Sequence, residues 1–167
     1  RATLSNAIEG WRRAEHRIEA EKECKFWLKH NLGRDYGNMT GLYFYGDVGT
    51  GKTTIAARCA VKAIKTGNVS SFIWVKEYDL MMATKAMGYE AKQEASNLFR
   101  RLETSELAVI DEMFAVSESL TDHAKVMIGQ AIAKRFESKL PTIVTSNHDP
   151  AWAALYDVRV NSRFNGM

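Results

Sequence analysis

Residues 46–53 read Gly-Asp-Val-Gly-Thr-Gly-Lys-Thr, which is a complete G-x-x-x-x-G-K-T motif. The apolar and aromatic run 42–45 precedes it between two glycines, as expected for a strand buried on both faces. Residues 52–65 place apolar side chains on one helical stripe, so a helix should follow. A glycine-rich turn that matched this motif by chance would need neither a buried strand before it nor a helix after it. The three segments together predict a phosphate-binding loop.

Each part of this loop has a physical role in binding a phosphate chain. The glycines let the backbone curl so that successive N–H groups point at the anion, and the next helix offers its positive N-terminus. Lys52 adds a mobile charge for the outer phosphates, and the Thr53 hydroxyl can coordinate Mg²⁺. We therefore expect ATP and Mg²⁺ as ligands. The expected nucleotide-binding residues are Gly46, Asp47, Val48, Gly49, Thr50, Gly51, Lys52, Thr53 and Thr54.

The rest of the chain alternates between strand and helix patterns. Further strands are predicted at 69–75, 107–110 and 142–145, and further helices at 79–87, 91–102 and 122–136. This alternation is typical of an α/β protein with a mostly parallel sheet flanked by helices. Ligands of such sheets lie at the carboxyl ends of the strands, so the residues that follow each strand matter most.

Two acids, Asp111 and Glu112, follow the apolar strand 107–110. Such a pair is costly at the end of a buried strand unless something cationic lies beside it. Asp111 is placed to hold Mg²⁺ through its water shell, and Glu112 could polarise an attacking water. Alone, the pair would be read as a surface turn or a helix cap. Together with the phosphate loop, it predicts a hydrolytic site.

The strand 142–145 runs into Ser146, Asn147 and His148. If this strand lies beside the other two, the Asn147 amide can hydrogen-bond both the γ-phosphate and the water. The alternative is that Asn147 caps the segment after Pro150. His148 is interpreted as an ordinary loop histidine.

Composition limits the class of protein. The 167 residues are 46% hydrophobic and 26% charged, which fits one globular domain, and the net charge of +3 permits a polyanionic partner without demonstrating one. No apolar run reaches the length of a membrane span. Cys24 and Cys59 are too few for a disulfide framework, so we expect a reducing compartment, with Cys59 as a small buried apolar residue. Because the chain starts at Arg1, we expect it to be part of a longer protein.

The order of these motifs resembles an AAA+ ATPase core. The phosphate loop is followed by Val-Ile-Asp-Glu at 109–112, Thr-Ser-Asn at 145–147 and Arg-x-x-x-Arg-Phe at 159–164. More narrowly, the chain is similar to the initiator and helicase-loader branch, of the bacterial DnaC and DnaI type, which includes the IstB transposition ATPases. The resemblance runs from about residue 37 to residue 164.

This resemblance implies roles that the spacing alone does not give. Asn147 would be the first sensor, and Arg163 the arginine finger that reaches a neighbouring subunit, with Arg159 as its companion. Lys52, Glu112, Asn147 and Arg163 would then form the catalytic set, and hydrolysis would depend on self-association. We expect a helical segment at 1–36 and the AAA+ domain at 37–167. Relatives continue into a fifth strand and a lid, which we expect to be missing from this chain.

In this branch an extra helical element precedes the acid-bearing strand and lines a channel for single-stranded DNA. The corresponding residues here are 78–102, where Lys85, Tyr89 and Lys92 suit single-strand binding by charge and stacking. A solvated helix face is the alternative. A second candidate edge, at 117–125, offers phosphate contacts from Ser119, Thr121 and Lys125.

The sequence therefore predicts a cytoplasmic ATPase of a bacterium or a phage-infected cell, which delivers a replicative DNA helicase under the control of ATP and single-stranded DNA. The nearest alternative is an IstB-like transposition helper that acts on duplex DNA. A P-loop kinase for a small molecule would need an arginine-rich lid, which the sequence lacks. A scaffold that binds but does not hydrolyse nucleotide would leave the two acids and Asn147 unexplained.

Overall fold

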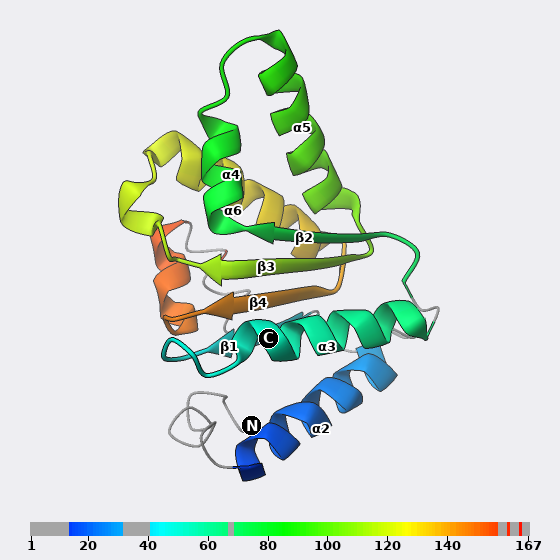
Figure 1. Cartoon of the computed structure of the whole chain (residues 1–167). Coiled ribbons are helices and arrows are strands. Elements are labelled where there is room, and N and C mark those ends of the chain that lie inside the picture. The colour runs from blue at the N-terminus through cyan, green and yellow to red at the C-terminus, as the bar shows by residue number, and fades with distance from the viewer. Residues whose placement is uncertain (1–13, 32–40, 67–68, 157–159, 161–163, 165–167) are drawn as a thin grey trace.

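Four parallel strands form one sheet in the order β1-β4-β3-β2 in a computed structural model, which describes residues 14–31, 41–66, 69–156, 160 and 164 (Figure 1). The strands are β1 (Gly41–Tyr45), β2 (Phe72–Lys76), β3 (Leu107–Met113) and β4 (Thr142–Ser146). The predicted parallel α/β sheet is confirmed. The prediction of a strand start at residue 69 is wrong by three residues, because pairing with β3 begins at Phe72.

Helices connect the strands and cover both faces of the sheet. They are α2 (Ala14–Asn31), α3 (Lys52–Lys65), α4 (Glu77–Thr84), α5 (Tyr89–Thr104) and α6 (Asp122–Glu137), with short 3₁₀ turns η1 (Ser117–Ser119) and η2 (Pro150–Leu155). The predicted helix at 79–87 starts and ends earlier. It begins at Glu77 because the Asp79 carboxylate accepts a hydrogen bond from the Lys76 N–H at 3.1 Å.

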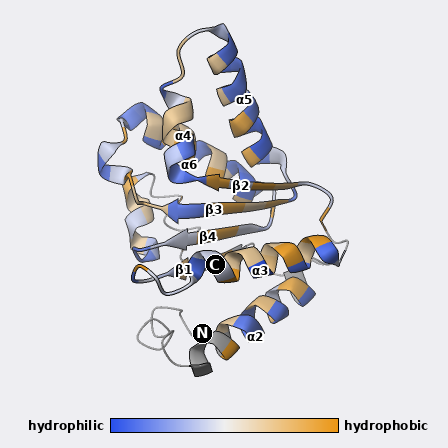
Figure 2. Ribbon diagram, viewed as in Figure 1, coloured by the Kyte–Doolittle hydropathy of each residue, from blue (hydrophilic) through white to orange (hydrophobic). Residues whose placement is uncertain are grey.

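The two faces of the sheet have separate cores, because successive side chains of a strand point to opposite sides. In β1, Leu42 and Phe44 pack with α2 and α3, whereas Tyr43 packs with α4, α5 and α6. In Figure 2, β2 and the first part of β3 are hydrophobic, and β3 becomes hydrophilic at its arrowhead. That arrowhead is the carboxyl end of the strand, where the predicted acids lie.

Helix α2 packs on α3 at the lower side of the molecule in Figure 1. Cys24 of α2 and Cys59 of α3 are buried against each other, with 6.1 Å between their Cα atoms, and form a disulfide. The prediction of reduced cysteines, with Cys59 as a simple apolar filler, is therefore wrong. Sequence spacing could not show the pair, because the two residues are 35 apart and meet only when the helices pack.

Among the helices of the described residues, none is both long and apolar enough to cross a membrane.

Candidate active site

The phosphate loop lies between the end of β1 and the start of α3. Gly49 and Gly51 have φ values of 80° and 87°, in the left-handed region that glycine adopts without strain. Gly51 is the N-cap of α3, so the first N–H groups of the helix face the loop. The loop therefore presents the backbone donors and the positive helix end that an anion requires.

The Lys52 ammonium is folded over the loop. Its Nζ donates hydrogen bonds to the carbonyl oxygens of Gly46 and Asp47 at 2.7 and 2.8 Å. Burial lowers the pKa of Lys52, and the nearby carboxylates of Asp47 and Asp111 act in the opposite direction. Lys52 therefore places its amino group at the centre of the loop.

The Thr53 hydroxyl meets the acid-bearing strand at the end of the loop. It donates a hydrogen bond to Asp111 Oδ1 at 3.0 Å, and Asp111 is only 2% exposed. The structure thus brings together the two residues predicted to hold Mg²⁺. A buried carboxylate beside a hydroxyl is a set of oxygen donors that suits this hard cation. Within the described residues, no cluster of three or more His, Cys, Asp or Glu offers another metal site.

Glu112 points away from Asp111 and is exposed. Its carboxylate lies 3.0 Å from the ammonium of Lys76 at the end of β2, and both side chains are about half exposed. This ion pair raises the pKa of Lys76, mainly through the hydrogen bond with Glu112. Sequence reasoning missed Lys76, although it is the last residue of a strand at the same edge as the acids.

The tip of β4 bears the predicted sensor, Asn147, which is exposed. Asp149, and not Asn147, caps the turn after Pro150, because its carboxylate accepts from the Ala151 N–H at 2.8 Å. The alternative role for Asn147 is thus taken by another residue. His148 stacks on Trp152 with 3.7 Å between ring centroids, as an ordinary loop residue could.

The arginines Arg159 and Arg163 lie outside the described residues. The neighbouring apolar residues Val160 and Phe164 are buried, and Phe164 packs on Tyr43 with 5.4 Å between ring centroids. The segment is thus anchored in the core at two positions.

No protein-family model matches the chain. Over 115 residues it is 28% identical to the replicative helicase loader DnaI of Bacillus subtilis, which covers 68% of this chain and 35% of that protein. A crystal structure of DnaI superimposes with a TM-score of 0.72 at 24% identity, covering 90% of this chain and 81% of that one. The replication initiator DnaA bound to AMPPCP and single-stranded DNA superimposes with a TM-score of 0.68 at 22% identity, covering 98% and 47%.

The chain has the AAA+ fold and is similar in sequence to part of DnaI. It spans about a third of the length of the curated relative. The predicted AAA+ fold class is confirmed, with four parallel strands among the described residues.

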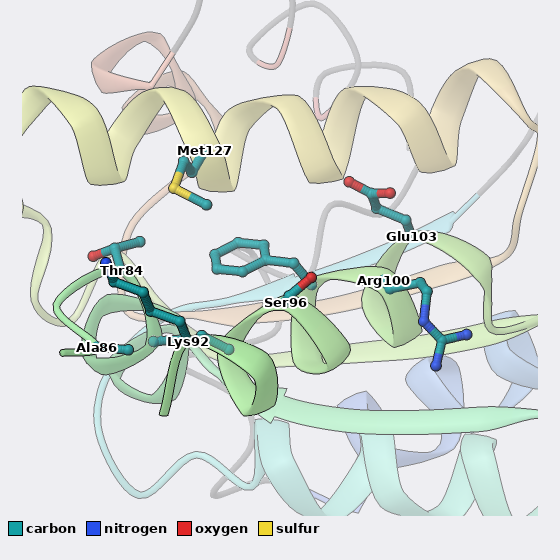
Figure 3. Close-up of a pocket in the computed structure, with 10 residues that line it drawn as sticks. Thr84, Ala86, Lys92, Ser96, Arg100, Glu103 and Met127 are labelled. Carbon is teal, nitrogen blue, oxygen red and sulfur yellow. The ribbon is translucent and has the colours of Figure 1, made fainter. Parts of the chain in front are cut away.

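Helices α4 and α5 occupy the region in which the sequence predicts the extra helical element. Lys85, Tyr89 and Lys92, predicted to contact DNA, are all exposed at or after the turn between these helices. Lys92 lines a groove of about 420 Å³ between α4, α5 and α6, together with Arg100 and Phe99 (Figure 3). Tyr89 and Lys92 therefore lie at the start of α5, and Lys92 also lines the groove.

The second predicted DNA edge of the AAA+ domain is partly engaged in local structure. The Thr121 hydroxyl caps α6 by accepting from the Ala124 N–H at 3.2 Å. Lys125 lies 4.0 Å from Asp122, and Ser119 is exposed. Thr121 thus has a structural role that the sequence prediction did not include.

A cleft of about 260 Å³ adjoins the phosphate loop between α2 and α3. Thr54, a predicted nucleotide-binding residue, lines it, and so do Glu21 and Arg58, which form an ion pair at 2.9 Å. Helix α2 therefore borders the phosphate loop, a contribution that its mixed charges did not reveal.

A buried carboxyl links this edge to α4. Glu77 is fully buried, accepts a hydrogen bond from the Val116 N–H at 2.8 Å and another from the Tyr156 hydroxyl. Burial raises the pKa of Glu77 despite these hydrogen bonds. The start of α4 is thereby fixed to the segment after β3, and nothing in the sequence around Glu77 distinguished it from a solvated acid.

Proposed function

We propose that this chain is the ATPase core of a DnaC-like helicase loader, which binds ATP and Mg²⁺ at residues 46–54 and hydrolyses ATP at the contact between subunits. The observation that carries the proposal is the hydrogen bond from Thr53 to the buried Asp111, because it joins the phosphate loop to the acid-bearing strand. The DnaI relative is a replicative helicase loader, and the similar DnaA structure contains AMPPCP and single-stranded DNA. Both support this substrate and this class of partner.

The chemistry follows from the side chains at the strand ends. Lys52 would exchange its two carbonyl partners for phosphate oxygens, which form stronger, charge-assisted hydrogen bonds. Mg²⁺ held by Thr53 and Asp111 would supply positive charge to the same oxygens. Asn147 would orient the water and the γ-phosphate, and Arg163 of a neighbouring subunit would stabilise the charge that develops.

Glu112 would take the proton from the attacking water. In the structure its carboxylate is paired with Lys76, so it has to leave that ammonium before it can act as a base. Because both side chains are about half exposed, the pair contributes little stability and can exchange partners easily.

The nucleotide state would then change the contacts between subunits and the grip on single-stranded DNA. Exposed Lys85 and Tyr89 offer charge and a stacking surface at one end of α4 and α5, and Lys92 enters the neighbouring groove. Ser119 and Lys125 would add phosphate contacts at the second predicted edge. Such coupling would time the delivery of a replicative helicase.

Steady-state ATP turnover, measured across protein concentrations with and without single-stranded DNA, tests the proposal. We expect turnover per subunit to rise with concentration and to change when DNA is added. Arg163→Ala should lower turnover about 1,000-fold, as loss of an arginine finger does. Lys65→Ala, an exposed cation at the far end of α3, should leave it unchanged. Turnover that is independent of both protein concentration and DNA would contradict the loader and favour a self-contained kinase-like site.

A further inference from the structure

The sheet is interrupted where the two acids lie. In the pairing of β3 with β4, Ile110 is opposite Val144 and Met113 is opposite Ser146, so Asp111 and Glu112 share one partner position. This is a β-bulge, with two residues on one strand opposite a single residue on the other. Glu112 has a φ of 57°, in the left-handed region that residues other than glycine rarely occupy.

Thr145 is the residue opposite the bulge, and its hydroxyl contacts both acids. It donates a hydrogen bond to Asp111 Oδ1 at 2.5 Å and accepts one from the Glu112 backbone N–H at 3.0 Å. Thr145 is 1% exposed, so water does not compete for either bond. One buried hydroxyl thus fixes the carboxylate of one acid and the backbone of the other.

The neighbouring Ser146 closes the bulge on its far side. Its hydroxyl donates to the Met113 carbonyl at 2.7 Å and accepts from the His148 N–H at 2.9 Å. The ladder between β3 and β4 is therefore completed by side-chain hydroxyls where its backbone bonds are interrupted. Thr145 differs from Ser146 in that its partners are the two acids themselves.

We propose that Thr145 is a positioning residue for the hydrolytic site, which orients Asp111 toward Mg²⁺ and holds the backbone conformation that turns Glu112 away from it. The inference rests on the proposed function, in which this site binds Mg²⁺ and hydrolyses ATP. It assigns to Thr145 a role beyond that of a β-branched residue in a buried strand. Residues that orient a metal ligand in this way change metal affinity or activity about 10- to 100-fold when they are lost.

The test compares Thr145→Val, which keeps the branched shape and removes the hydroxyl, with Thr145→Ser, which keeps the hydroxyl. The matched control is Thr142→Val, because Thr142 is a buried threonine of the same strand whose hydroxyl bonds Arg135 and Leu140 at the opposite end. Each variant is examined by amide hydrogen exchange without nucleotide and by ATP turnover across Mg²⁺ concentrations.

We expect the Glu112 amide to be protected in the wild type and to exchange about three- to tenfold faster in Thr145→Val, the effect of one lost hydrogen bond. The Mg²⁺ concentration for half-maximal turnover should rise about 10- to 100-fold in Thr145→Val. Thr145→Ser should stay near the wild type in both measurements. Thr142→Val should change neither.

The inference is overturned if the Glu112 amide is unprotected in the wild type, a result that needs no variant to fold. It is also overturned if Thr145→Val leaves exchange unchanged, or if Thr145→Ser is as impaired as Thr145→Val. Failure of the proposed function is distinct, because it would appear as a wild type without ATP turnover. The exchange experiment on nucleotide-free protein would still decide whether Thr145 holds the bulge.

Discussion

At the amino ends of β3 and β4, Arg135 of α6 is fully buried, and all its hydrogen-bond acceptors within the described part of the chain are neutral oxygens. The acceptors are the carbonyls of Leu102 (2.5 Å), Ser105 (2.8 Å) and Pro141 (2.7 Å) and the hydroxyl of Thr142 (3.0 Å). At the carboxyl ends, Lys52 also donates to carbonyls, but it is only partly buried, and Glu112 is exposed in an ion pair.

The two ends of the sheet differ in what could replace the hydrogen-bond partners of these charged side chains. The oxygens around Arg135 belong to the segments that lead into β3 and β4, and these residues are buried with the guanidinium. The partners of Lys52 and Glu112 lie at an accessible edge, where phosphate and water can take their place. One end of the sheet therefore uses its charge for stability, and the other keeps its charges available for chemistry.

Removing the Glu112 charge at the carboxyl ends of the strands should give the largest effect, and this effect should be on activity alone. Glu112→Gln deletes the proposed general base and should lower ATP turnover at least 100-fold. Its free energy of unfolding should stay within about 0.5 kcal/mol of the wild type, because Glu112 is exposed. Turnover assays and urea unfolding on the same preparation measure both effects. Normal turnover would remove Glu112 from its role.

Removing the buried charge at the amino ends of the strands should instead lower the stability of the fold. Arg135→Met leaves buried carbonyl oxygens without their donor and should lower the free energy of unfolding by about 3 kcal/mol. Lys134→Met is the matched control, because its exposed ion pair with Glu103 contributes about 1 kcal/mol or less. Chemical denaturation measures both variants. Equal losses in the two would show that Arg135 is not a structural centre.

A smaller effect should distinguish Glu77, a buried acid at the carboxyl ends of the strands. Its pKa is raised by burial, so between its ordinary value and the raised one the folded protein binds more protons than the unfolded chain. The stability from Glu77 is complete below the ordinary pKa and declines as the pH rises through the raised pKa. The slope is at most about 1.4 kcal/mol per pH unit.

Glu77→Gln should remove this part of the pH dependence, and urea midpoints from pH 4.5 to 8 measure it. Glu118→Gln is the control, because Glu118 is exposed in η1. The pH profile of stability should therefore differ from that of the wild type for Glu77→Gln and not for Glu118→Gln. Parallel pH profiles for Glu77→Gln and the wild type would contradict a raised pKa for this buried carboxyl.

Local patterns were sufficient to predict the sheet and the position of the phosphate loop beside the acid-bearing strand. The phosphate loop and the acid pair are contiguous in sequence, and the geometry of parallel sheets brings their strands to one edge. The meeting of Thr53 with Asp111 follows from these two facts.

Features made by packing between distant segments could not be predicted in this way. The bond of Thr145 to Asp111 joins residues 34 apart, and the bulge that creates it depends on the register of two strands. The hydrogen bond from Tyr156 to Glu77 spans 79 residues. Lys76 is different, because its position at the end of a strand pattern is visible in the sequence, although the prediction of the site did not include it.

Nucleotide binding by Lys52→Ala tests the central claim most directly, that the carboxyl edge is a site for ATP and Mg²⁺. Titration of a fluorescent ATP analogue in the presence of Mg²⁺ would give the dissociation constants of wild type and variant. Loss of a hydrogen bond to a charged phosphate should weaken binding roughly 10- to 100-fold. Equal affinity for the two proteins, or no binding by the wild type, would contradict the account.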